Sequence, residues 1–245
     1  MGRAFEFRKE RKMKRWSKMA KQFTRVGKDI AMAVKEGGPD PDANPRLRMV
    51  LQNAKAVNMP KDNIERAIKK ASDKNNKENF DEVLFEGYAP HGVAVIIETA
   101  TDNNNRTVAN IRSYFTKVEG SLGKSGSVDY LFDRKCHFKI QADGIDLEEL
   151  EFELIDFGVE EVFEDEAEEG AEYQGKVAMI YGGFTNFGTL QSELESRKIE
   201  IIESGFERIP QNYIALNEEQ QEEVNKLLEL IEEDDDVMEV YHNMK

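Results

Sequence analysis

Three stretches in the first third of the chain carry apolar residues at intervals of three and four, the period of an amphipathic helix. The first stretch begins at Trp16 and ends at the glycines before Pro39. The second ends near Asn58, and the third opens at Pro60, since a proline is tolerated in a first helical turn. Together they predict a three-helix bundle over residues 16–73. Its apolar faces are Trp16, Met19, Ala20, Phe23, Val26, Ile30 and Val34; Leu47, Val50, Leu51, Ala54 and Val57; and Ile64, Ala67, Ile68 and Ala71.

Residues 1–15 lack such a stripe and are dense in charge, which predicts an arm that stays mobile until it meets a partner. A polar linker is predicted at 72–80.

Beyond the linker the pattern changes to the two-residue period and the β-branched and aromatic content of strands. The middle of the chain predicts one complete βαββαβ unit, the ferredoxin-like order. Its elements are a strand at 135–141, a helix at 146–157, strands at 159–164 and 175–182, a helix at 186–197 and a strand at 199–208.

The segments on either side predict a second unit of the same kind. A strand, helix and strand precede residue 135, with FEGY, GVAVIIETA and SVDYLFD as strand-like segments and the helix within 105–118. A strand at 211–216, a helix at 218–232 and a strand at 237–241 follow.

The predicted fold class is therefore α+β, an N-terminal three-helix domain followed by two ferredoxin-like domains, one inserted into the other. The domains are 1–77, 78–134 with 209–245, and the inserted 135–208.

Charge divides the chain at the same linker. Residues 1–77 hold 21 Lys and Arg against 9 Asp and Glu, a net charge of +12, whereas the remainder holds 13 against 40, a net charge of −27. A module this basic is typical of a polyanion binder, because each cation that neutralises a phosphate releases condensed counterions. Nucleic acid is the leading predicted partner.

The candidate nucleic-acid-binding residues are the cations of the N-terminal module. Aromatic residues are interleaved with them, although Trp16 and Phe23 are better explained as bundle core. A second cluster on the third helix either extends this surface or pairs with Asp62, Glu65 and Asp73. The candidates are Lys9, Arg11, Lys12, Lys14, Arg15, Lys18, Lys21 and Arg25, with Lys61, Lys69 and Lys70, beside Arg66, in the second cluster.

Signatures of catalysis are weak. The three histidines are scattered, and Cys136 and His137 are adjacent rather than at ligand spacing, so we predict no metal, no cofactor and no enzymatic activity. GSLGKSGS at 120–127 resembles a phosphate loop but has Val118 where that motif requires a glycine, which favours a simple turn.

TDNNNRT at 101–107 precedes a predicted helix and has two interpretations. Asp102, Asn103 and Arg106 form a possible partner-binding site at the helix N-terminus, and the alternative is ordinary capping of orphan amides.

The run from Asp143 to Glu172 contains 15 acidic and no basic residues. A solvated face is the simplest interpretation. A sharper hypothesis is that it repels nucleic acid and orients the basic arm, or docks a basic protein.

A single cysteine excludes an intramolecular disulfide framework, and the start of the chain lacks the apolar segment of a signal peptide. No apolar run approaches the ~20 residues of a membrane helix. We expect a cytoplasmic protein.

Several long motifs resemble the YebC family, whose members are named probable transcriptional regulators and include a mitochondrial translational activator of cytochrome c oxidase. They are GGPDPDANPRLR (37–48), NMPKDNIERAIKK (58–70), FEGYAPHGVAVIIE (85–98), TDNNNRTVANIR (101–112) and GSLGKSGSVDYLFDRK (120–135). The resemblance implies a helical domain and two ferredoxin-like domains. Here the usual start, GHSKW, is replaced by GRAFEFRKERKMKRW, so only basic character carries over to the N-terminus.

The resemblance implies DNA binding and transcriptional control for some members, and ribosome association that helps translation of difficult sequences for others. The leading hypothesis is a DNA-binding transcriptional regulator. The alternatives are a translation factor that binds ribosomal RNA, and an acidic adaptor that binds a basic protein.

Overall fold

Three helices form the N-terminal part of the protein: α1 (Arg3–Gly37), α2 (Pro45–Ala56) and α3 (Lys61–Ser72). The computed structural model describes residues 3–73, 76, 79–165, 173 and 175–245, with side chains from Ala20 onward. The helices pack around a shared core that includes Ile30, Leu47, Ala54 and Ile64. The predicted bundle is therefore present, but its core takes residues of α1 only from Val26 onward: Ala20 is exposed, and Phe23 is not among the core residues. The side chains of Trp16 and Met19 lie outside the described part of the structure.

One buried side chain fixes the turn between α1 and α2. Asn44 caps α2, since its Oδ1 accepts the Leu47 amide at 3.0 Å. Its Nδ2 donates back to the carbonyls of Ala33 (2.7 Å) and Gly38 (2.8 Å). Gly38 has φ +87°, a left-handed conformation that glycine adopts without strain, and this ends α1.

The prediction of a separate N-terminal arm was wrong for the backbone, because α1 is helical from Arg3. Residues 3–26 contain neither proline nor glycine and are rich in strong helix formers such as Arg, Lys, Glu and Met. The result is a single helix of 35 residues, about 50 Å long.

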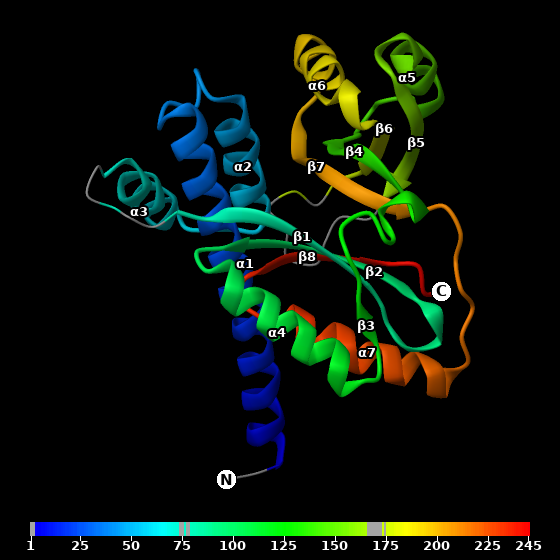
Figure 1. Ribbon diagram of the computed structural model, residues 1–245. Helices are drawn as coiled ribbons and strands as arrows, with labels where there is room; N and C mark the ends of the chain where they lie inside the picture. The colour runs from blue at the N-terminus through cyan, green and yellow to red at the C-terminus, as the bar shows by residue number, and fades with distance from the viewer. Residues whose placement is uncertain (1–2, 74–75, 77–78, 166–172, 174) are drawn as a thin grey trace.

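The first sheet has the order β3-β1-β2-β8 and is antiparallel throughout. Its strands are β1 (Asp81–Tyr88), β2 (Ala94–Thr101), β3 (Ser121–Leu122) and β8 (Val237–His242). Helices α4 (Asn104–Lys117) and α7 (Glu218–Glu232) cover one face (Figure 1), with Val95, Ile97, Ile111 and Leu227 in the core.

The predicted strand at 211–216 was wrong. In that segment only Ile214 forms a bridge, to Met244. The backbone of Ile214 pairs only with the chain end after β8: its amide donates to the Asn243 carbonyl (2.7 Å), and its carbonyl accepts from the Lys245 amide (3.0 Å). The predicted strand SVDYLFD (127–133) was also wrong except at its last two residues, because residues 129–131 form a 3-10 turn and the strand β4 begins at Phe132.

The second sheet has the order β5-β6-β4-β7. Its strands are β4 (Phe132–Gln141), β5 (Val159–Asp165), β6 (Val177–Gly183) and β7 (Ile201–Pro210), with α5 (Leu147–Leu154) after β4 and α6 (Phe187–Ser196) after β6. This is the predicted βαββαβ order. Figure 1 shows α5 and α6 together above the sheet. Cys136, Phe138, Leu154 and Leu190 belong to the core between them.

The three parts contact one another through polar side chains. The Asn53 side chain on α2 pairs with both backbone groups of Ser204 on the edge strand β7, donating to the carbonyl (2.8 Å) and accepting from the amide (3.1 Å). Arg208 on β7 reaches Glu98 on β2 at 3.0 Å. The fold class is confirmed, and the domain boundaries at 77, 134 and 208 stay a prediction.

Candidate nucleic-acid interface

Helix α1 is fastened to the first sheet by one buried lysine. The Nζ of Lys28 donates to the carbonyls of Ala100 (2.8 Å) and Asp235 (2.7 Å) and lies 3.3 Å from Oδ1 of Asp236. All three ammonium protons therefore have acceptors. One turn earlier, Arg25 donates to the carbonyls of Val237 (3.1 Å) and Glu232 (3.5 Å).

Asp236 is the centre of this anchor. Its carboxylate accepts from Arg106 (2.7 and 3.0 Å), Thr107 (2.8 Å) and Thr101 (3.2 Å) as well as meeting Lys28. Burial acts to raise the pKa of Asp236, but the hydrogen bonds from Arg106 and Thr107 and the Lys28 charge outweigh it, so the pKa lies below its usual value. The group stays ionised.

The same contacts explain the segment TDNNNRT. Asn103 caps α4 by accepting the Arg106 amide at 3.2 Å. The Arg106 guanidinium bridges Asp102 (2.8 Å) and Asp236. These geometries match the capping interpretation, and the partner-binding role of Asp102, Asn103 and Arg106 stays a prediction.

The anchor leaves the N-terminal half of α1 to extend past α4 and α7, as Figure 1 shows. At 100° per residue, positions 11, 14, 18, 21, 25 and 28 fall within a stripe roughly 100° wide. Lys21 is half-buried. Lys9, Arg11, Lys12, Lys14, Arg15 and Lys18 lie on the helical backbone, and their side chains fall outside the described part of the structure.

The second basic cluster lies elsewhere on the bundle. Helix α3 packs beside the C-terminal half of α1 through Ile64 and Ala71, which separates it from the projecting half. Lys61, Lys69 and Lys70 are exposed. Lys61 lies 3.8 Å from Glu65, and Arg66 donates to the Asp62 carbonyl at 3.1 Å, so the cluster is partly paired within its own helix.

The glycine-rich loop at 120–127 holds a carboxylate of the protein itself. Glu86 is buried on β1 and accepts the amides of Gly126 (2.6 Å), Val128 (2.8 Å) and Asp129 (2.9 Å). Burial acts to raise the pKa of Glu86, but these three amides outweigh it and lower the pKa. The backbone amides that could donate to a phosphate in this loop therefore already donate to the Glu86 carboxylate.

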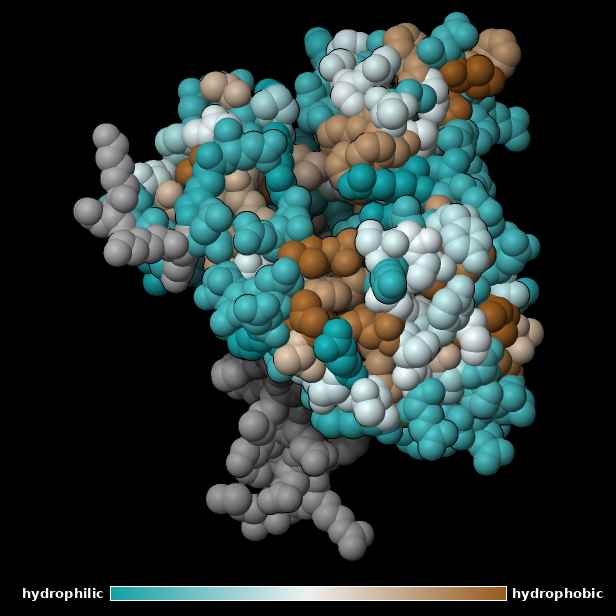
Figure 2. Space-filling view, viewed as in Figure 1, coloured by the Kyte–Doolittle hydropathy of each residue, from teal (hydrophilic) through white to brown (hydrophobic). Residues whose placement is uncertain are grey.

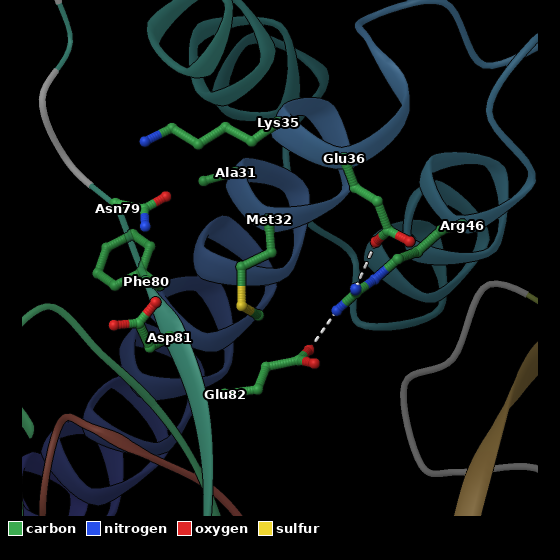
Figure 3. Close-up of a pocket in the computed structure, with 9 residues that line it drawn as sticks. All are labelled: Ala31, Met32, Lys35, Glu36, Arg46, Asn79, Phe80, Asp81 and Glu82. Carbon is green, nitrogen blue, oxygen red and sulfur yellow. Dashed lines mark hydrogen bonds and ion pairs between the residues drawn. The ribbon is translucent and has the colours of Figure 1, made fainter.

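A pocket of about 390 Å³ marks the junction between the bundle and the first sheet. Figure 3 shows Arg46 reaching from α2 toward Glu36 on α1, 2.6 Å away, and toward Glu82 on β1. Asp29 lies near this junction. Burial raises the pKa of Asp29 to about 7, reinforced by Glu82, Glu239 and Glu98 and opposed by Arg46.

Chemistry typical of enzymes is sparse in the described residues. Among them, no group of three His, Cys, Asp or Glu side chains could hold a metal ion. Cys136 is fully buried, and burial raises the pKa of its thiol to about 11, so it is a poor nucleophile.

Sequence reasoning missed Lys28, Asp236 and Glu86, the three buried charges that organise this region. Lys28 looked like one more cation of the basic module, and Glu86 like one polar residue in a strand. Only the pairing of distant segments distinguishes them from solvated charges.

Two family profiles cover almost all of the chain. The "TACO1/YebC protein N-terminal domain" matches residues 3–74, and the "TACO1/YebC second and third domain" matches residues 80–244. The chain belongs to the TACO1/YebC family. The resemblance in the sequence motifs is thereby confirmed.

Full-length relatives and a solved structure agree with this membership. A protein of Flavobacterium johnsoniae named "Probable transcriptional regulatory protein" is 67% identical, covering 100% of this chain and 99% of its own. A protein of the same name from Parabacteroides distasonis is 53% identical, covering 100% and 97%. The crystal structure of a conserved hypothetical protein from Aquifex aeolicus, 39% identical, superposes with a TM-score of 0.74 over 92% of this chain and 90% of that one.

A membrane-spanning role has no support in the helices that the structure describes, none of which is long and apolar enough to cross a bilayer.

Proposed function

We propose that this protein is a non-enzymatic, cytoplasmic regulator of gene expression that binds nucleic acid through its basic N-terminal module. The observation that carries the proposal is the charge division, +12 before residue 78 and −27 after it. The anchored geometry of α1 adds to it, because Lys28 and Arg25 fasten the helix to the first sheet while its N-terminal half extends from the body.

Double-stranded DNA is the proposed target, in keeping with the transcriptional names of the relatives. In this proposal Lys9, Arg11, Lys12, Lys14, Arg15, Lys18 and Lys21 contact phosphates along the projecting part of α1. Arg25 has the smaller share, since two backbone carbonyls already occupy its guanidinium. Lys61, Lys69 and Lys70 form a second contact.

The test is a charge reversal in the full chain, Arg11, Lys14, Lys18 and Lys21 each replaced by Glu. Each lost phosphate contact flattens the slope of log affinity against log salt by about 0.9 on duplex DNA. We expect a loss of DNA affinity together with this flatter slope. The matched control reverses Arg112, Lys117, Lys124 and Lys226, four exposed cations outside the module. Equal losses in both variants, or no loss in the first, contradict the proposal.

A translational role is the main rival, and sedimentation with ribosomes separates the two. Comigration with ribosomes that survives moderate salt and needs the four N-terminal cations would favour a translation factor. A protein that stays free of ribosomes and still shifts duplex DNA supports the transcriptional role.

A further inference from the structure

Helix α5 presents two large apolar side chains to solvent at the outer end of the inserted lobe. Phe152 is 77% exposed and Ile155, in the turn that continues the helix, is 56% exposed. Neither belongs to the core of this lobe, which α5 enters through Leu150 and Leu154. In Figure 2 brown side chains stand among teal ones at the end of the molecule where Figure 1 places α5.

The position of these side chains on the helix is opposite to the core. At 100° per residue, Phe152 lies about 180° from the midpoint of Leu150 and Leu154. Glu148, Glu149, Ile155 and Asp156 fall within roughly 60° of Phe152 on the same side. The outward face of α5 is thus an apolar centre with an acidic margin.

The carboxylates of the acidic margin have no cationic partner among the described residues. Glu148, Glu149 and Asp156 are exposed and make no ion pair there, whereas Glu153, on another side of the helix, pairs with Arg197. Asp156 also lies at the C-terminal end of the helix, where the helix dipole disfavours a negative charge. Exposed apolar surface and unpaired carboxylates together favour a cationic partner with an apolar side chain.

We propose that the outward face of α5 and its following turn, with Phe152 and Ile155 as anchors, docks a positively charged amphipathic segment of another protein. Lysines or arginines of that segment would lie against Glu148, Glu149 and Asp156, and an apolar residue would cover Phe152. Nucleic acid is disfavoured here, because its phosphates would meet carboxylates. Two copies of this face would likewise repel each other. A face with only two apolar anchors is small for a protein interface, and it therefore supports a weak, reversible contact.

The test uses the full chain and a synthetic amphipathic helical peptide with leucines on one side and lysines on the other. Binding is followed by fluorescence anisotropy of the labelled peptide. The double variant Phe152→Ser with Ile155→Ser is expected to weaken binding about tenfold, the usual size for losing a central apolar contact. The matched control is Tyr130→Ser with Tyr213→Ser, which removes two aromatic rings of 65% and 57% exposure elsewhere on the surface.

A charge variant and a second peptide complete the experiment. Neutralising Glu148, Glu149 and Asp156 to the amides is expected to weaken binding and flatten its salt dependence. A peptide with the same lysines but serines for leucines is expected to bind at least several-fold more weakly. Thermal melting confirms that each variant is folded.

Several outcomes overturn the proposal. They are no peptide binding, equal binding by the double variant, or equal binding of the serine peptide, which would indicate attraction to acidic surface in general. A concentration-dependent dimer that Phe152→Ser dissolves would assign the face to a second copy of this chain instead. DNA binding is expected to be unchanged in the double variant. Failure of this docking proposal can therefore be distinguished from failure of the proposed function.

Discussion

The ammonium of Lys28 and the carboxylate of Asp236 lie 3.3 Å apart although 208 residues separate them along the chain. Both side chains are buried, and the acceptors around the ammonium are shared between the end of β2 and the segment that leads into β8. This pair joins the first helix to the segment that leads into the last strand. It sets the direction in which the basic half of α1 leaves the body.

Removing one member of this pair is expected to destabilise the fold strongly. Asp236→Ala leaves the Lys28 and Arg106 charges without their shared acceptor, and breaking a buried pair costs about 3–5 kcal/mol. Urea unfolding of the variant measures the loss. The control is Asp235→Ala, which also removes one negative charge, but from an exposed carboxylate outside this network. A loss no larger than the control's would contradict the anchoring role.

Glu86→Gln is expected to loosen the glycine-rich loop. The amide retains an acceptor oxygen but loses the charge that binds three backbone amides, and the cost of such a charged hydrogen-bond set is about 1–3 kcal/mol. Hydrogen exchange of Gly126, Val128 and Asp129 should accelerate, while amides of α7 stay protected. The exposed Glu119→Gln is the control. Unchanged exchange at these three amides would show that the carboxylate is dispensable.

The raised pKa of Asp29 predicts that the protein becomes less stable as the pH rises. Its pKa in the folded protein is about 7, whereas the unfolded value is 3.8, so between these values the folded state binds more protons than the unfolded state. The contribution of Asp29 to stability is therefore fully present below pH 3.8 and is lost as the pH rises to about 7. Asp29→Asn is expected to lose less stability than the wild type between pH 5 and pH 8, measured by urea unfolding. The exposed Asp62→Asn should behave like the wild type.

Cys136 offers a probe of whether the lobes open separately. With a thiol pKa of about 11, only about one thiol in a thousand is ionised at pH 8, and the side chain is fully buried, so labelling requires opening of the second sheet. Leu190→Ala, which leaves a cavity beside this sheet, is expected to accelerate labelling at least tenfold. Leu227→Ala in the core of the first sheet should have little effect. Equal acceleration by both would contradict the predicted division into separate domains.

Much of this architecture follows from local patterns. The three-residue and four-residue spacing around Ile30, Leu47 and Ile64 predicted the bundle, and alternation predicted the βαββαβ order of the second sheet, because each of these elements buries one face of its own sequence. The division of charge is also a property of the sequence alone. So is the outward position of Phe152 relative to Leu150, once α5 is predicted as a helix.

Tertiary structure decided what depends on pairing between distant segments. Residues 211–216 resemble a strand, yet in the fold only Ile214 of this segment forms a bridge, to Met244 after β8. Lys28 and Glu86 resemble surface charges, yet each is enclosed by acceptors or donors from segments far away in the chain. A periodic pattern records which face of an element avoids water. It does not record which partner satisfies a buried charge, because that partner is chosen by the fold as a whole.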